Sequence, residues 1–86
     1  MIENAELGAL FSAMQEDAVY LRPDIYALYG VLHGGGPFLG WIMDFPEGGA
    51  ILYDPRERVP WISDSAEQIL ATHQRLGAAR LEPLDR

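Results

Sequence analysis

The chain has no lysine and no cysteine, and its six arginines are outnumbered by thirteen carboxylates, which gives a net charge of -7. The absence of cysteine excludes disulfides, thiolate metal ligands and cysteine nucleophiles, and it fits a reducing compartment. The acidic composition disfavours nucleic acid, because contacts to phosphate groups need clustered lysine and arginine. We therefore expect no nucleic-acid partner and an attraction to a basic protein partner.

Long hydrophobic runs are also missing. No apolar stretch approaches the roughly 18 residues that a membrane-spanning helix needs, and the first residues lack the basic segment of a secretory signal. We expect no membrane association and a cytoplasmic location. The lysine-free composition, rich in arginine and alanine, is typical of GC-rich coding and predicts a bacterial source.

The apolar material is sufficient for a core, because 49% of the 86 residues are hydrophobic and 10% are aromatic. A chain this short cannot hold a second core, so residues 1–86 are expected to form a single domain. Such a domain buries only about 60–65% of the surface that its unfolded chain exposes. Because this leaves a thin stability margin, we expect a homodimer to add stability.

Residues 4–19 predict an N-terminal helix, because their apolar residues recur at helical spacing and Asn4 can serve as the cap. The apolar positions are Leu7, Leu10, Phe11, Met14 and Ala18.

Residues 24–33 admit two interpretations. Pro23 and Gly34 stand where the first residue and the stop residue of a helix would stand. The aromatic and β-branched residues between them, together with the internal Gly30, favour a strand instead. We favour the strand, because the next two segments look like its partners.

Residues 38–54 predict a β-hairpin. Two strands, 38–45 and 50–54, flank a turn at 46–49 that contains a proline and two glycines. The larger apolar side chains of the first strand are assigned to the core face: Leu39, Trp41, Met43 and Phe45. Trp41 is therefore expected to pack in the core.

A second helix is expected after the cap candidates Ser63–Ser65, with Gly77 as its stop. Its apolar face consists of Ile62, Ala66, Ile69, Leu70, His73 and Leu76. Residues 59–62 contain Pro60 and fit an edge or irregular segment, and residues 78–86 fit a short last strand or an ordered tail. The expected fold is α+β: an N-terminal helix, a three-stranded antiparallel meander, and a C-terminal helix packed on one face.

The motifs of known catalytic and metal sites are absent or incomplete. The segment 33–36 matches a glycine-rich part of the oxyanion hole in some esterases, but the G-x-S-x-G elbow of those enzymes is missing. We interpret the segment as a hairpin loop. The two histidines, His33 and His73, are distant in the chain and have no carboxylate in helical register, so we expect no metal site and no cofactor.

The residues expected to form a binding surface are aromatic and charged side chains at the turns. Trp61 stands near Arg56 and Arg58, and tryptophan and arginine dominate binding hot spots. Acidic turn residues and the other tryptophan complete this candidate surface: Asp44, Glu47, Asp54 and Trp41. Glu57 is a further carboxylate at these turns. An alternative pocket would use two tyrosines and the two histidines: Tyr26, Tyr29, His33 and His73.

Three classes of function agree with these observations. The first is a non-catalytic protein-binding domain that acts on a basic partner, as an inhibitor, antitoxin or immunity protein does. The alternative is a small homo-oligomeric enzyme or ligand-binding domain that uses the aromatic and histidine pocket. A third class, a structural subunit, predicts an extensive apolar face on the surface.

Overall fold

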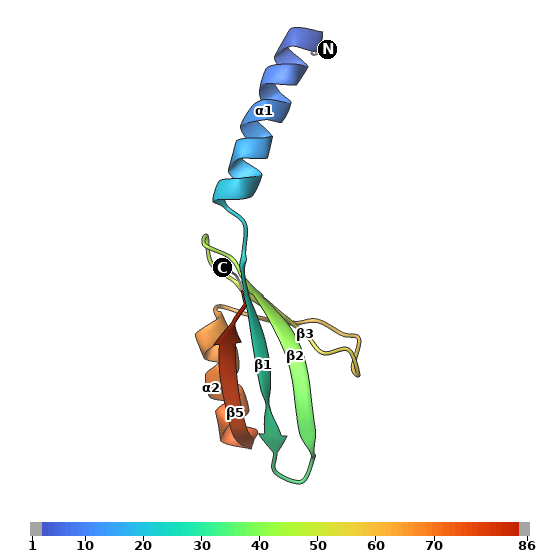
Figure 1. Cartoon of the computed structure of the whole chain (residues 1–86), viewed down its shortest axis with the longest axis vertical. Helices are drawn as coiled ribbons and strands as arrows, with labels where there is room; N and C mark the ends of the chain where they lie inside the picture. Colours follow the sequence, from blue (N-terminus) through green and yellow to red (C-terminus); the bar gives the residue numbers. More distant parts are fainter. Residues whose placement is uncertain (1–2, 85–86) are drawn as a thin grey trace.

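The computed structural model describes residues 3–84, which form two helices and one five-stranded antiparallel sheet. The elements are α1 (Asn4–Tyr20), β1 (Asp24–Leu32), β2 (Pro37–Asp44), β3 (Ala50–Tyr53), β4 (Trp61–Ser63), α2 (Ala66–Leu76) and β5 (Gly77–Pro83). The strand order across the sheet is β4-β3-β2-β1-β5. The expected α+β class is confirmed. Figure 1 shows α2 lying along the sheet and α1 pointing away from it.

The predicted three-stranded meander is wrong in its extent, because a further strand lies at each edge of the sheet. β4 includes the end of segment 59–62, for which we expected an edge or irregular conformation. It is an edge strand that pairs with β3 through Ile62 opposite Ile51. β5 pairs with β1 from Gly77 opposite Leu32 to Pro83 opposite Tyr26. The partner of β5 lies far away in the chain, so no local pattern could report this pairing.

β1 is a strand, which resolves the ambiguity of residues 24–33. It is hydrogen-bonded on both sides, to β2 and to β5. Gly30 lets β5 approach closely, because a β-carbon at this position would overlap the carbonyl oxygen of Ala78. The glycine that disfavours a helix is therefore a packing position of the sheet.

The predicted hairpin is confirmed as the pair β2 and β3, whose register runs from Trp41 opposite Tyr53 to Asp44 opposite Ala50. Its turn contains Gly48 and Gly49, both with positive φ. Only glycine adopts this backbone conformation without strain.

The face of β2 that meets the core is the opposite of the predicted one. Ile42 is fully buried. The side chains assigned to the core are exposed or only half-buried: Leu39, Trp41, Met43 and Phe45. Gly40 supplies the physical reason, because a β-carbon there would stand 2.9 Å from Leu52 Cδ1. The missing side chain makes room for Leu52 on the α2 side of the sheet, where the core then forms.

The core lies between the sheet and α2. It consists of Leu28, Ile42, Ala50, Leu52, Ala66, Ile69 and Ala79. α2 contacts all five strands, so the sheet that it covers is wider than the predicted meander. Ile62 does not join this core, because it is 71% exposed and pairs with Ile51 on the other face of the sheet.

α1 contacts no other described helix or strand, and none of its described residues is buried. Its N-cap is Glu3 instead of the predicted Asn4, and no side chain bonds to the cap position. The helix ends at Leu21, whose backbone N–H donates to the carbonyl of Asp17. Because α1 continues away from the sheet (Figure 1), the molecule measures 59 Å along its longest axis and 23 by 20 Å across.

The start of α2 confirms Ser65 as a cap. Its hydroxyl oxygen accepts a hydrogen bond of 3.1 Å from the backbone N–H of Gln68. The side-chain oxygen of Gln68 accepts in turn from the hydroxyl of Ser63 and the backbone N–H of Asp64. These bonds satisfy donors that a helix start leaves without intrahelical partners.

We expect Ser65→Ala to lower the free energy of unfolding by about 1 kcal/mol, because the N–H of Gln68 loses its acceptor. Ser65→Thr keeps a hydroxyl and is the matched control. Urea denaturation followed by circular dichroism measures both changes. Equal losses in the two variants would show that the hydroxyl does not stabilise the helix.

Candidate binding site

A pocket of about 290 Å³ lies between the end of β1, the loop from β3 to β4, and the last turns of α2. Apolar walls come from Leu32, Leu52, Val59 and Leu76, and the chemically active groups belong to Asp54, Glu57, Trp61 and His73. This volume is at the lower limit for ligand pockets, about 300 Å³. The pocket is therefore suited to a single side chain or a small molecule.

His73 is held in a fixed orientation at the inner wall. It is 6% exposed, and its Nδ1 lies 2.8 Å from the backbone carbonyl oxygen of Ile69. Because a carbonyl only accepts, Nδ1 carries the proton, and in this tautomer Nε2 is an acceptor. The ring contacts two aromatic rings, with centroid distances of 5.4 Å to Phe38 and 4.9 Å to Trp61.

Asp54 orders the loop at the pocket. Its Oδ1 accepts a 2.8 Å hydrogen bond from the backbone N–H of Arg56, and its carbonyl accepts from the N–H of Arg58 at 2.9 Å. Arg58 adopts a positive φ of 60°, a conformation that few residues other than glycine adopt. The loop thus brings two carboxylates, those of Asp54 and Glu57, to the same pocket.

The two arginines predicted to bind belong to this loop but do not line the pocket. The guanidinium of Arg56 donates from Nη2 to the carbonyl of Pro37 at 2.7 Å, which ties the loop to the start of β2. Arg58 is exposed. The structure therefore gives Arg56 a contact that positions the loop beside the pocket.

The other predicted binding residues lie elsewhere. Glu47 is in the turn of the β2–β3 hairpin and Asp44 immediately precedes that turn, whereas Asp54 follows β3 at the open end of the hairpin. The predicted acidic turn residues are therefore divided between two ends of the sheet. Trp41 lies on the face opposite α2 and is 40% exposed, so the two tryptophans do not share a surface.

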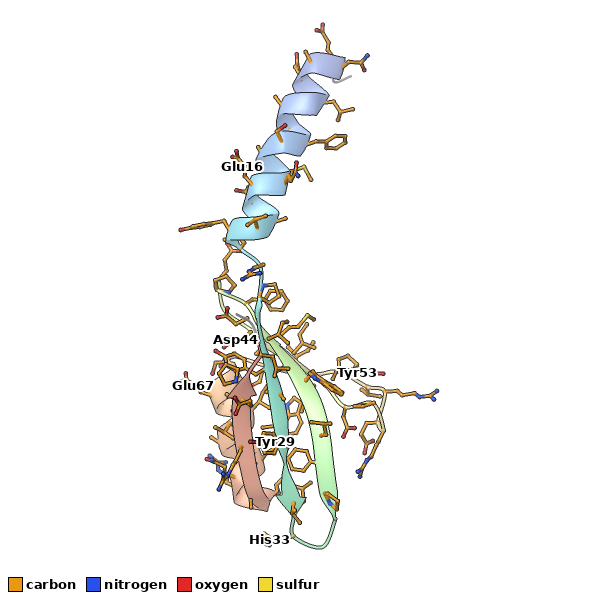
Figure 2. All side chains as sticks on the ribbon, in the orientation of Figure 1. Glu16, Tyr29, His33, Asp44, Tyr53 and Glu67 are labelled. Carbon is orange, nitrogen blue, oxygen red and sulfur yellow. The ribbon has the colours of Figure 1, made fainter. Side chains whose placement is uncertain are left out.

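The alternative pocket residues are also distributed over the molecule. Tyr26 packs against the core on the α2 side, whereas Tyr29, three positions along β1, lies on the opposite face. His33 is exposed in the turn after β1, and Figure 2 shows it at the end of the sheet distant from Asp44. Only His73 of this set lines the pocket.

The pocket combines residues from both predicted sets, since Trp61 and Asp54 belong to the first and His73 to the second. Phe38 was missed because its strand face was assigned to solvent. Residues 38, 40 and 42 of β2 share one face, so the alternation of the strand places Phe38 on the same side as Ile42. The sequence did not show that this side is buried, because both faces of β2 are apolar.

Within residues 3–84, no group of three or more histidine, aspartate or glutamate side chains is placed to hold a metal ion. No helix of this described part is long and apolar enough to cross a membrane. No protein-family model, curated protein or solved structure was found to match this chain.

Proposed function

We propose that this chain is a non-catalytic protein-binding domain of the inhibitor, antitoxin or immunity class, acting in the cytoplasm on a basic protein partner. Its pocket receives one cationic side chain of that partner. The observation that carries the proposal is the meeting of Asp54, Glu57, Trp61 and His73 in one pocket of about 290 Å³.

Each group in the pocket favours a cation with hydrogen-bond donors. The carboxylates of Asp54 and Glu57 attract positive charge and accept hydrogen bonds. The ring of Trp61 is the most favourable aromatic surface for a cation, and in the tautomer that carries the proton on Nδ1, His73 adds an acceptor at Nε2. A planar guanidinium can stack on the indole and reach the carboxylates, so arginine is the expected side chain.

The charge of the whole chain supports a basic partner. A net charge of -7 produces a negative field that attracts positively charged proteins and accelerates their approach. The same field repels polyanions, so nucleic acid is a poor partner. After the field has attracted the partner, the pocket determines which of its side chains is bound.

The proposal is tested with a short capped peptide that contains one arginine and with the same peptide carrying citrulline, its neutral isostere. We expect the arginine peptide to shift the NMR signals of the Trp61 indole and of His73, with an affinity at least about tenfold above that of the citrulline peptide. The ¹⁵N-labelled full chain is titrated with each peptide.

The matched variants place the effect in the pocket. Asp54→Asn/Glu57→Gln removes two charges there and should lower the affinity for the arginine peptide about tenfold. Asp44→Asn/Glu47→Gln removes two charges at the other end of the hairpin and should change it less than about threefold. Equal affinity for citrulline, or equal effects of the two variants, would contradict the proposal. Preferential binding of a neutral small molecule would support the ligand-binding alternative.

A further inference from the structure

The face of the sheet opposite α2 has no cover. Strand parity and register place large apolar side chains there in adjacent rows: Tyr29, Val31, Leu39, Trp41, Met43, Tyr53 and Ile62. We call this set the open face. From typical areas of about 150–250 Å² per large side chain, the open face leaves on the order of 700 Å² of apolar surface uncovered. The largest patch on an ordinary monomer is about 300–600 Å², so the open face is larger than such a patch.

α1 is the second uncovered apolar surface. Leu10, Phe11 and Met14 lie along one side of this helix, and we call these three residues the α1 stripe. All three are exposed, Phe11 to 58%. A single helix of this length is marginal in water, because helices are stabilised mainly by packing of their apolar face. No such packing exists within the described chain.

The two surfaces match in size. The 17 residues of α1 span about 25 Å, and the 9 residues of β1, which runs through the open face, span about 30 Å. The large side chains of the α1 stripe, Leu10, Phe11 and Met14, add roughly 300 Å² of uncovered surface. Together they exceed the roughly 800 Å² per partner that a standard stable interface buries.

We propose that the open face is covered by α1 of a second copy of this chain, in a two-fold dimer in which each helix lies on the sheet of the other. In this arrangement the open face and α1 of each copy are covered by those of the other copy, so no other molecule is needed. Such a self-complementary contact is an isologous interface. Each sheet then has a helix on both faces, an arrangement that buries its apolar side chains on each side.

The linker favours a second copy over α1 folding back on its own sheet. Only Leu21–Pro23 separate α1 from β1, and Pro23 restricts the preceding residue to an extended backbone. The chain consequently leaves α1 in line with β1, as Figure 1 shows. Folding back would require the chain to reverse its direction within these three residues.

The first test measures the mass of the full chain by sedimentation equilibrium, with an expected value of twice 9.6 kDa. Phe11→Glu on α1 and Leu39→Glu on the open face should each raise the dimer dissociation constant about a hundredfold. Ala71→Glu adds the same charge at an exposed residue of α2, on the other face of the sheet and outside the pocket, and should leave the dissociation constant unchanged. A monomer throughout, or a dimer insensitive to Leu39→Glu, would overturn the proposal.

The second test identifies the contact directly. The chain has no cysteine, so a cysteine introduced by Ser12→Cys is the single attachment point for a nitroxide spin label. Ser12 lies on α1 outside the α1 stripe. The nitroxide-labelled variant, which contains no ¹⁵N, is mixed with ¹⁵N-labelled wild-type chain. We expect broadening of Leu39 and Trp41 amides on the open face, with weaker effects at Ile69 in α2. A second sample carries the nitroxide and ¹⁵N in the same chain. Broadening in this sample but not in the mixed sample would mean that α1 covers its own sheet. That result would overturn the proposal and leave the pocket test unaffected.

Discussion

Replacing Ile42 by alanine should lower the free energy of unfolding by about 2–5 kcal/mol, the range for buried isoleucine truncations. Ile42 is fully buried, and it lies in the cluster formed by the sheet and α2. The truncation leaves a cavity that the surrounding side chains fill only partly, so the loss exceeds the transfer free energy of the removed atoms. Urea denaturation monitored by circular dichroism measures it.

The neighbouring residue provides the control. Met43→Ala removes a side chain of comparable size on the opposite face, where Met43 is 40% exposed. We expect a loss below about 1 kcal/mol. Both changes are best compared in the Phe11→Glu background, in which self-association through α1 does not contribute. A larger loss for Met43→Ala would mean that the core lies on the face predicted from side-chain size.

Gly30→Ala should destabilise the sheet by about 1–3 kcal/mol, the usual cost of forcing extra atoms into a packed site. The added carbon would overlap the carbonyl oxygen of Ala78 and stand 2.9 Å from the α-carbon of Ala79. Both are backbone atoms, so relief requires β5 to separate from β1. The lower entropy of the unfolded chain offsets only about 0.4–1 kcal/mol of this loss.

Gly36→Ala is the matched control in the turn between β1 and β2. A β-carbon at Gly36 meets nothing within 4 Å, so we expect a change within about 0.5 kcal/mol. Hydrogen exchange locates the effect: Gly30→Ala should accelerate exchange of the Leu28 amide and of amides in β5. Equal stability of the two variants would show that the β1–β5 contact accommodates a side chain.

Local sequence patterns were sufficient to predict those features of the fold that depend on residues within one short segment. The cap Ser65 and the stop Gly77 define the ends of α2, and two glycines define the turn between β2 and β3. These signals act through hydrogen bonds and backbone conformations within a few residues. The α+β class could be predicted from such segments alone.

The candidate site could be predicted only in parts. Trp61 and Asp54 were singled out from their residue types and from the turn that separates them, and His73 from its chemistry. Their meeting depends on the loop after β3 lying beside α2, and this loop is tied to β2 by the contact of Arg56 with Pro37. That contact joins residues distant in the sequence, which no spacing rule describes.

The sequence by itself determined the helices, the hairpin, the acidic charge and the absence of lysine and cysteine, because these follow from residue type and local order. Only the tertiary structure decided which face of β2 is buried. Both faces of that strand are apolar, so alternation could not distinguish them. The choice follows from Gly40, which admits Leu52 and allows α2 to pack there, and it leaves the larger side chains around Trp41 on the open face.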